Sequence, residues 1–109
     1  MAHRSPFLHS IVLTNANQEY NLLTLLQALD PDIPKRCQSL ELQFDLDAAA
    51  DRLYIGNPGT VGATDTGVAL VASQGWIISS MDANLVFLSD IALKSNGASH
   101  KVNVSLITR

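Results

Sequence analysis

Three aspartates near a predicted turn are the first candidates for a site, because their side chains could bind a metal ion. Asp45, Asp47 and Asp51 offer carboxylate oxygens, which are the ligands that Ca²⁺ takes in proteins. Their spacing departs from that of an EF-hand, because Ala49 and Ala50 replace an oxygen ligand and the invariant glycine. A solvated turn, stabilised by hydrogen bonds from the aspartate side chains to the backbone, is therefore the favoured interpretation.

A glycine-rich stretch, residues 56–62, has the composition of a phosphate-binding loop. Such a loop needs a lysine beside a serine or threonine, with a helix directly after it. Here no lysine is present and the following residues are typical of a strand. We therefore interpret the stretch as a β-turn loop.

The histidines and the cysteine show no spacing typical of a reactive site. His3, His9 and His100 form neither a helical pair nor a pair with closely spaced cysteines, so folding alone would have to assemble a zinc site. Cys37 together with a histidine could act as a nucleophile, but a lone thiol just before an apolar strand is typical of a buried residue. We expect no catalytic residue, no metal and no cofactor, and we do not expect an enzyme.

Trp76 is the single tryptophan, and it lies among strands that are apolar on both faces. Packing in the core is the favoured role for its large ring, and an anchor in a protein interface is the alternative. Residues 68–72 and 76–78 alternate poorly between apolar and polar types. Because a sandwich buries one face of each sheet, the second face is expected to meet another layer or another subunit.

One short helix is predicted near the N-terminus. Four leucines recur at helical spacing, with Asn21 as the N-cap and Pro31 as the stop: Leu22, Leu25, Leu26 and Leu29. We expect about two turns, lying across an open end of a β structure.

The remaining segments are typical of strands and turns. Apolar and polar residues alternate over residues 40–46 and 100–108, and a hairpin is predicted at Asn96-Gly97. Shorter strands are predicted at residues 7–14, 52–55, 68–72, 76–78, 85–88 and 91–93. About eight antiparallel strands separated by turns indicate an all-β sandwich or barrel, formed as a single domain over residues 1–109.

The composition excludes several classes of protein. Of the 109 residues 47% are hydrophobic and 16% are charged, with a net charge of −3, whereas average domains have about 25% charged residues. This excludes a basic nucleic-acid binder and a disordered chain. The apolar runs are too short for a membrane span, and His9 and Ser10 interrupt what would be the apolar part of a secretion signal. We expect synthesis in a cytoplasm and a surface made partly for contact with protein.

Residues 39–43, 54–70 and 86–95 carry a resemblance to a known family. These segments resemble small virion structural proteins of tailed bacteriophages, which decorate or cement the capsid. The resemblance covers about residues 38–108, and residues 1–37 match less well. It implies an antiparallel β-sandwich, jelly-roll-like, that oligomerises on the outer capsid surface and has no catalytic residues.

We therefore expect a protein that stabilises a capsid by bridging major capsid protein subunits. Its partners would be the major capsid protein and itself, with a trimer favoured over a dimer, and neither nucleic acid nor a membrane. Contacts are expected from an N-terminal arm, residues 1–7, from the loop after residue 56 and from the region of the tryptophan. The interface candidates are Arg4, Phe7, Tyr54, Asn57, Pro58, Thr60, Val61 and Trp76.

The alternative is a carbohydrate- or receptor-binding module of a phage fibre or tail. Such modules use aromatic platforms, and Trp76 with Tyr54 would have to supply one here. The aromatic content of 6% is low for a sugar binder.

Overall fold

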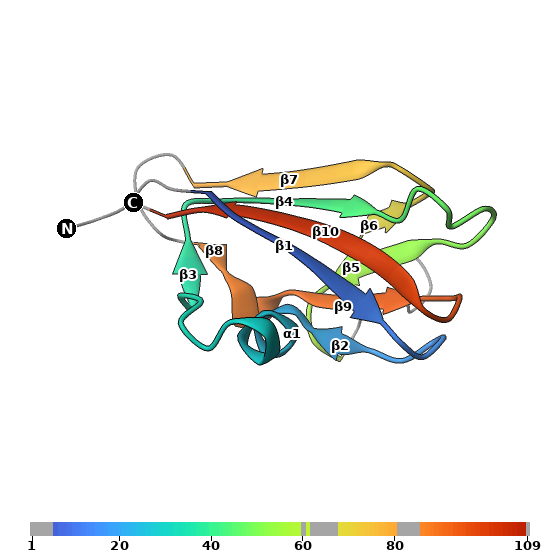
Figure 1. The fold of residues 1–109 in the computed structure, drawn as a ribbon, viewed down its shortest axis with the longest axis horizontal. Helices are drawn as coiled ribbons and strands as arrows, with labels where there is room; N and C mark the ends of the chain where they lie inside the picture. Colours follow the sequence, from blue (N-terminus) through green and yellow to red (C-terminus); the bar gives the residue numbers. More distant parts are fainter. Residues whose placement is uncertain (1–5, 60, 62–67, 81–85, 109) are drawn as a thin grey trace.

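The computed structural model describes residues 6–59, 61, 68–80 and 86–108. Its elements, in chain order, are β1 (Pro6–Leu13), β2 (Tyr20–Asn21), α1 (Leu22–Leu29), β3 (Arg36–Cys37), β4 (Ser39–Phe44), β5 (Leu53–Gly56), β6 (Val68–Leu70), β7 (Gly75–Ser79), β8 (Val86–Phe87), the short 3₁₀ helix η1 (Leu88–Asp90), β9 (Ala92–Ser95) and β10 (His100–Ile107). The predicted all-β sandwich with one short helix is confirmed (Figure 1).

Two four-stranded antiparallel sheets form the sandwich. Sheet A has the strand order β1-β10-β4-β7, sheet B has the order β2-β9-β5-β6, and β3 pairs with β8 in a separate ribbon. Five antiparallel pairs are nested along the chain: β1 with β10, β2 with β9, β3 with β8, β4 with β7, and β5 with β6. The chain is therefore one long hairpin rolled into two layers, and the additional pairs β10–β4 and β5–β9 complete the sheets.

The core lies between the two sheets and follows the predicted alternation. In β4 and β10 every second side chain is buried: Leu40, Leu42, Phe44, Val102, Val104 and Leu106. Full burial of one such side chain stabilises the fold by roughly 1.5–3 kcal/mol. The alternation in sequence continues to Leu46, but the strand ends at Phe44 and Leu46 is 66% exposed in the turn that follows.

Helix α1 forms where the leucine spacing predicts it. The Asn21 side chain caps it, because its Oδ1 accepts a hydrogen bond of 3.3 Å from the Thr24 N–H. Leu22 and Leu26 are buried, whereas Leu29 at the end of the same stripe is exposed. The helix contacts β1, β2 and η1, and β1 and β2 are edge strands of the two sheets. It therefore covers an open side of the sandwich.

The predicted hairpin at Asn96-Gly97 is wrong. Strand β9 belongs to sheet B and β10 belongs to sheet A, so the turn between them carries the chain across the sandwich. The left-handed residue is Ser99, with a φ of 58°. Asn96 instead binds the turn to the residue before β5, because its N–H donates to the Arg52 carbonyl and its Oδ1 accepts from the Arg52 N–H at 2.8 Å. Pairing with distant strands outweighed the local turn signal.

Neither helix in the described ranges has the length and apolar character needed to cross a membrane.

Candidate interaction surface

The side of sheet A that faces away from the core is a regular four-stranded surface. The strand registers set its side chains in rows across the four strands. One row is Leu8, Ser105, Glu41 and Ile77, and the next is Ser10, Asn103, Gln43 and Gly75. We call this surface, together with Val12, Lys101, Ile107, Ser39 and Ser79, the outer face of sheet A.

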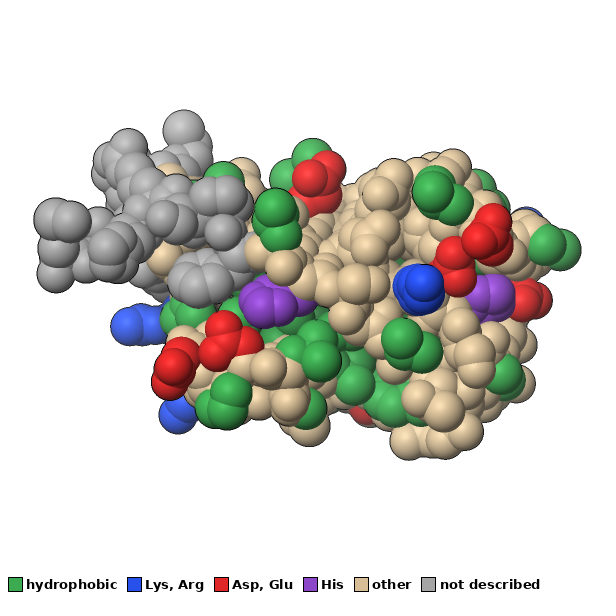
Figure 2. Space-filling view, viewed as in Figure 1, with side chains coloured by type: hydrophobic (Ala, Val, Ile, Leu, Met, Phe, Trp, Pro, Cys, Tyr) green, Lys and Arg blue, Asp and Glu red, His purple; other side chains and the backbone are tan. Residues whose placement is uncertain are grey.

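The outer face of sheet A combines exposed hydrophobic side chains with few charges. Leu8 is 71% exposed, and Val12, Ile77 and Ile107 are also exposed. In the described part of this face, Glu41 and Lys101 are the charged side chains. In Figure 2 the surface over β10 and β4 is mainly tan, the colour of the backbone and of side chains that are neither hydrophobic nor charged, with few charged side chains. Exposed apolar groups with depleted charge are typical of a surface that contacts protein.

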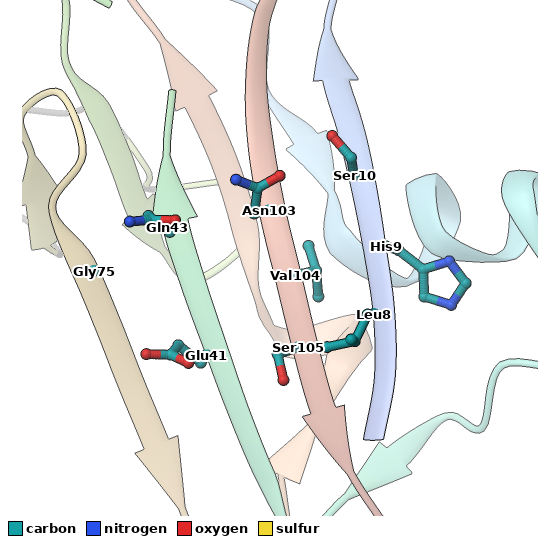
Figure 3. A pocket seen from close by; sticks show the side chains of 9 residues that line it. All are labelled: Leu8, His9, Ser10, Glu41, Gln43, Gly75, Asn103, Val104 and Ser105. Atoms are coloured by element: carbon teal, nitrogen blue, oxygen red, sulfur yellow. The ribbon is translucent and has the colours of Figure 1, made fainter. Parts of the chain in front are cut away.

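A groove of about 620 Å³ lies in the middle of this face. It is lined by Leu8, His9, Ser10, Glu41, Gln43, Gly75, Asn103, Val104 and Ser105 (Figure 3). The ring of His9 points away from it, toward α1. Gln43 is held in place, because its Nε2 donates a hydrogen bond of 3.2 Å to the Ser73 carbonyl. The groove therefore offers hydroxyl, amide and carboxylate groups in rows that the strand registers set.

Gly75 keeps one side of the groove open. Its φ lies outside the left-handed region, and a β carbon there would have the Leu42 carbonyl oxygen as its nearest neighbour, at an ordinary 3.5 Å. The fold therefore has room for a side chain at position 75. A glycine within a strand often marks a close approach by a ligand or by another backbone.

The loop after β5 contains several of the predicted interface residues. Asn57 and Pro58 are exposed, and Gly59 has a left-handed φ of 86° that favours glycine. Both carboxylate oxygens of Glu19 accept from the Gly59 N–H at 3.1 Å, so this donor is already engaged. Val61 is only 4% exposed, so its side chain is not available to a partner. The predicted turn is confirmed.

The structure does not bring Tyr54 and Trp76 onto one face. Tyr54 points outward from sheet B, since its neighbours Leu53 and Ile55 are buried. Trp76 points inward from sheet A, opposite buried Leu42, and packs half-buried against the core. The two rings therefore form no common aromatic platform.

The remaining interface candidates lie largely outside the described structure. Arg4 and Thr60 are outside the described residues. The backbone of Phe7 pairs with Leu106 in the β1–β10 register, and its side chain is outside the description.

A cluster that the sequence analysis missed lies at the end of the sandwich where β4 ends and β10 begins. The His100 ring lies between two carboxylates, with Nε2 2.7 Å from Asp51 Oδ2 and Nδ1 3.3 Å from Asp45 Oδ2. The hydrogen bond to Asp51 raises the pKa of His100 above its usual value, Asp45 adds to this, and partial burial opposes it. Because both ring nitrogens of His100 contact carboxylates, the cluster joins two loops, and neither nitrogen is free to act as a base.

The Asp45 side chain accepts several hydrogen bonds in the turn that follows β4. It accepts hydrogen bonds from the backbone N–H groups of Asp47 at 2.9 Å and Lys101 at 3.1 Å. These two bonds, followed by the contact with His100, hold the pKa of the Asp45 carboxyl below its usual range. The prediction of a turn stabilised by side-chain-to-backbone hydrogen bonds is confirmed. No group of three or more His, Cys, Asp or Glu within the described ranges could hold a metal ion.

Cys37 is a buried thiol, as predicted. Its exposed fraction is 0%, and burial raises its pKa to about 11. At neutral pH the thiol therefore stays protonated and is a poor nucleophile.

No family model, curated protein or solved structure matches this chain.

Proposed function

We propose that the protein is a virion structural protein that decorates a bacteriophage capsid and stabilises it by bridging major capsid protein subunits. The observation that carries the proposal is the outer face of sheet A, where exposed hydrophobic side chains lie beside a polar groove in which Glu41 is the one acidic lining residue. The resemblance of residues 38–108 to capsid decoration proteins gives this face its partner, the major capsid protein. The site of action would be the capsid surface.

The composition of the face fits a contact repeated over many copies. Leu8 and Ile77 lie in the same row near opposite borders of the sheet, with Ser105 and Glu41 between them. Each such contact contributes modestly, because only a small apolar area is available to bury. Many copies that bridge neighbouring subunits would reinforce one another through effective concentration.

The strand order supports the jelly-roll part of this proposal. A jelly roll is a double sheet of eight strands made from two Greek keys. Here eight strands divide equally between the sheets, and their pairs nest from β1–β10 inward to β5–β6.

The direct test is binding of the purified protein to expanded capsids of its source phage, measured by co-sedimentation. Leu8→Lys should weaken binding at least tenfold, about 1.4 kcal/mol, because it places a charge in an apolar contact. Leu46→Lys is the matched control, since Leu46 is similarly exposed but lies in the loop after β4. Equal binding by both variants would overturn the assignment of this face. Absence of the chain from purified virions, by mass spectrometry, would overturn the function.

The groove favours a second candidate function, a carbohydrate- or receptor-binding module of a phage fibre or tail. Its rows of hydroxyl and amide groups suit the hydroxyls of a glycan, although no Phe, Tyr or Trp lines the groove. Selective binding on a glycan array, abolished by Asn103→Ala and blocked by Gly75→Val, would support this function over capsid decoration. No binding to any glycan would exclude the carbohydrate-binding form of this function.

A further inference from the structure

Strand β7 is an edge strand of sheet A among the described residues, and it contains no charged residue. Among the described strands it pairs only with β4, and Figure 1 places it at the border of the sheet. Its residues are Gly-Trp-Ile-Ile-Ser, and Ile77 is 64% exposed. Natural proteins usually protect such an edge with charges, proline or a bulge. None of these protects β7, and the described edge strands of sheet B, β2 and β6, are only two and three residues long.

The backbone hydrogen bonds show which groups of β7 point away from the sheet. Flanking the strand, Phe44 N–H donates to the Gln74 carbonyl and Ser80 N–H donates to the Gln38 carbonyl. Antiparallel pairing alternates, so the even-numbered residues bond to β4. The N–H and C=O groups of Gly75, Ile77 and Ser79 therefore face outward.

We propose that two copies of this chain pair antiparallel through β7, around a two-fold axis at Ile77. In this register Ile77 of one copy lies opposite Ile77 of the second copy. Gly75 of each copy lies opposite Ser79 of the other. Every outward N–H and C=O group of the three residues then has its partner in the second copy. A register shifted by two residues would satisfy fewer of these groups.

The side chains fit a second copy better than an unrelated strand. At the two-fold axis a residue meets its own copy, so a charge there would repel itself, and Ile77 is neutral. On the inner side Trp76 of each copy lies opposite Ile78 of the other, an aromatic and β-branched pair that occurs twice. On the outer side the small residues Gly75 and Ser79 leave room for the paired isoleucines. Self-complementarity along the whole strand therefore points to a second copy.

The pairing gives the self-association in the proposed function a definite geometry. The two copies of sheet A would join into one eight-stranded sheet. Their outer faces would lie side by side, so each dimer would offer two capsid contacts. The unit is a two-fold dimer, in place of the trimer that the sequence analysis favours. The inference concerns the free protein and stands whether or not the outer face binds a capsid.

Analytical ultracentrifugation over a range of protein concentrations tests the pairing. Wild-type protein should form dimers, whereas Ile77→Lys and Ile77→Glu should each be monomeric, because like charges meet at the axis. An equimolar mixture of the two variants should form a heterodimer, because lysine then faces glutamate. Leu8→Lys is the control on the opposite edge strand and should still dimerise.

Two outcomes would overturn the proposal: a wild-type protein that stays monomeric, or a variant mixture that fails to associate. Both Ile77 variants should keep the wild-type circular dichroism spectrum, because the side chain is exposed. Capsid co-sedimentation is a separate measurement. A monomeric protein that still binds capsids would remove the dimer and leave the proposed function intact.

Discussion

The Asp51 carboxylate and the His100 imidazole, 49 positions apart in the chain, meet at 2.7 Å beside the backbone of Gly97. The same ring reaches Asp45 with its other nitrogen, so one histidine joins the turn after β4 to the start of β10. Its ring also packs edge-on against buried Phe44, with 5.3 Å between centroids. A polar contact at the end of the sandwich is thereby coupled to the core.

This contact predicts that stability falls as the pH rises above the pKa of histidine in the unfolded chain. The pKa of His100 is raised in the folded protein, so protonated His100 stabilises the fold fully below its unfolded value, about 6.5, and this stabilisation is lost as the pH passes through the higher folded value. Urea unfolding at several pH values should show this decline. His100→Gln should remove the decline and cost about 1 kcal/mol in mildly acidic solution, where His100 is protonated and the aspartates are ionised; the cost is modest since Asp51 is partly exposed.

The lowered pKa of Asp45 acts in the opposite direction. Its contribution is present above the ordinary value of the carboxyl, 3.8, and is lost as the pH falls through the lower folded value. The stability maximum is therefore expected between these two limits, in mildly acidic solution. A maximum at alkaline pH would contradict the assignment of His100, whereas stability that does not fall below pH 3.8 would contradict the assignment of Asp45.

The close packing around Gly97 allows a steric test of the contact between Asp51 and His100. A β carbon at this position would overlap the Asp51 carboxylate and lie 2.6 Å from His100 Nε2. Gly97→Ala should therefore displace the 42% exposed Asp51 side chain, lower the free energy of unfolding by about 1 kcal/mol through loss of its contact with His100, and weaken the pH dependence. Gly75→Ala is the matched control, because its β carbon meets only an ordinary contact, and it should be neutral or stabilising. Equal stability of the two variants would show that the Gly97 contact is unimportant.

Sequence patterns predicted the elements whose signal lies within a single segment of the chain. The alternation in β4 and β10 follows from burial of one face, and α1 follows from leucine spacing, an N-cap and a proline stop. Strand β3 was missed, because two residues are too few to show any period.

Long-range pairing could not be read from the sequence. Asn96-Gly97 has the composition of a hairpin turn, yet β9 and β10 find partners in different sheets, and only the complete topology determines this. The contact between His100 and the two aspartates was missed for the same reason. Its members are 49 and 55 positions apart and share no local motif.

Replacement of Asn21 is expected to lower stability, because its one side chain makes two hydrogen bonds. Its Oδ1 caps α1, and its Nδ2 donates to the Ser89 carbonyl at 2.9 Å. Asn21→Ala should lower the free energy of unfolding by about 1–2 kcal/mol, measured by urea denaturation. Asn21→Ser should recover part of the loss, because serine caps a helix but cannot reach as far. If serine and alanine are equally destabilising, the cap contributes nothing.

The stability of variants at Leu42 and Leu46 tests how far the alternation of buried and exposed side chains extends along the chain. Both belong to one alternating run in the sequence, but Leu42 is fully buried and Leu46 is 66% exposed. Leu42→Ala should cost about 2–5 kcal/mol, because it leaves a cavity between the sheets.

Leu46→Ala should change stability by less than about 0.5 kcal/mol, because little apolar area is lost. Thermal unfolding separates the two, since 1 kcal/mol corresponds to roughly 4–8 °C in a domain of this size. A large loss from Leu46→Ala in the monomer would mean that Leu46 is buried and that β4 extends beyond Phe44. A loss seen only at concentrations where the protein associates would instead place Leu46 in an interface, and would argue against β7 as the contact between copies.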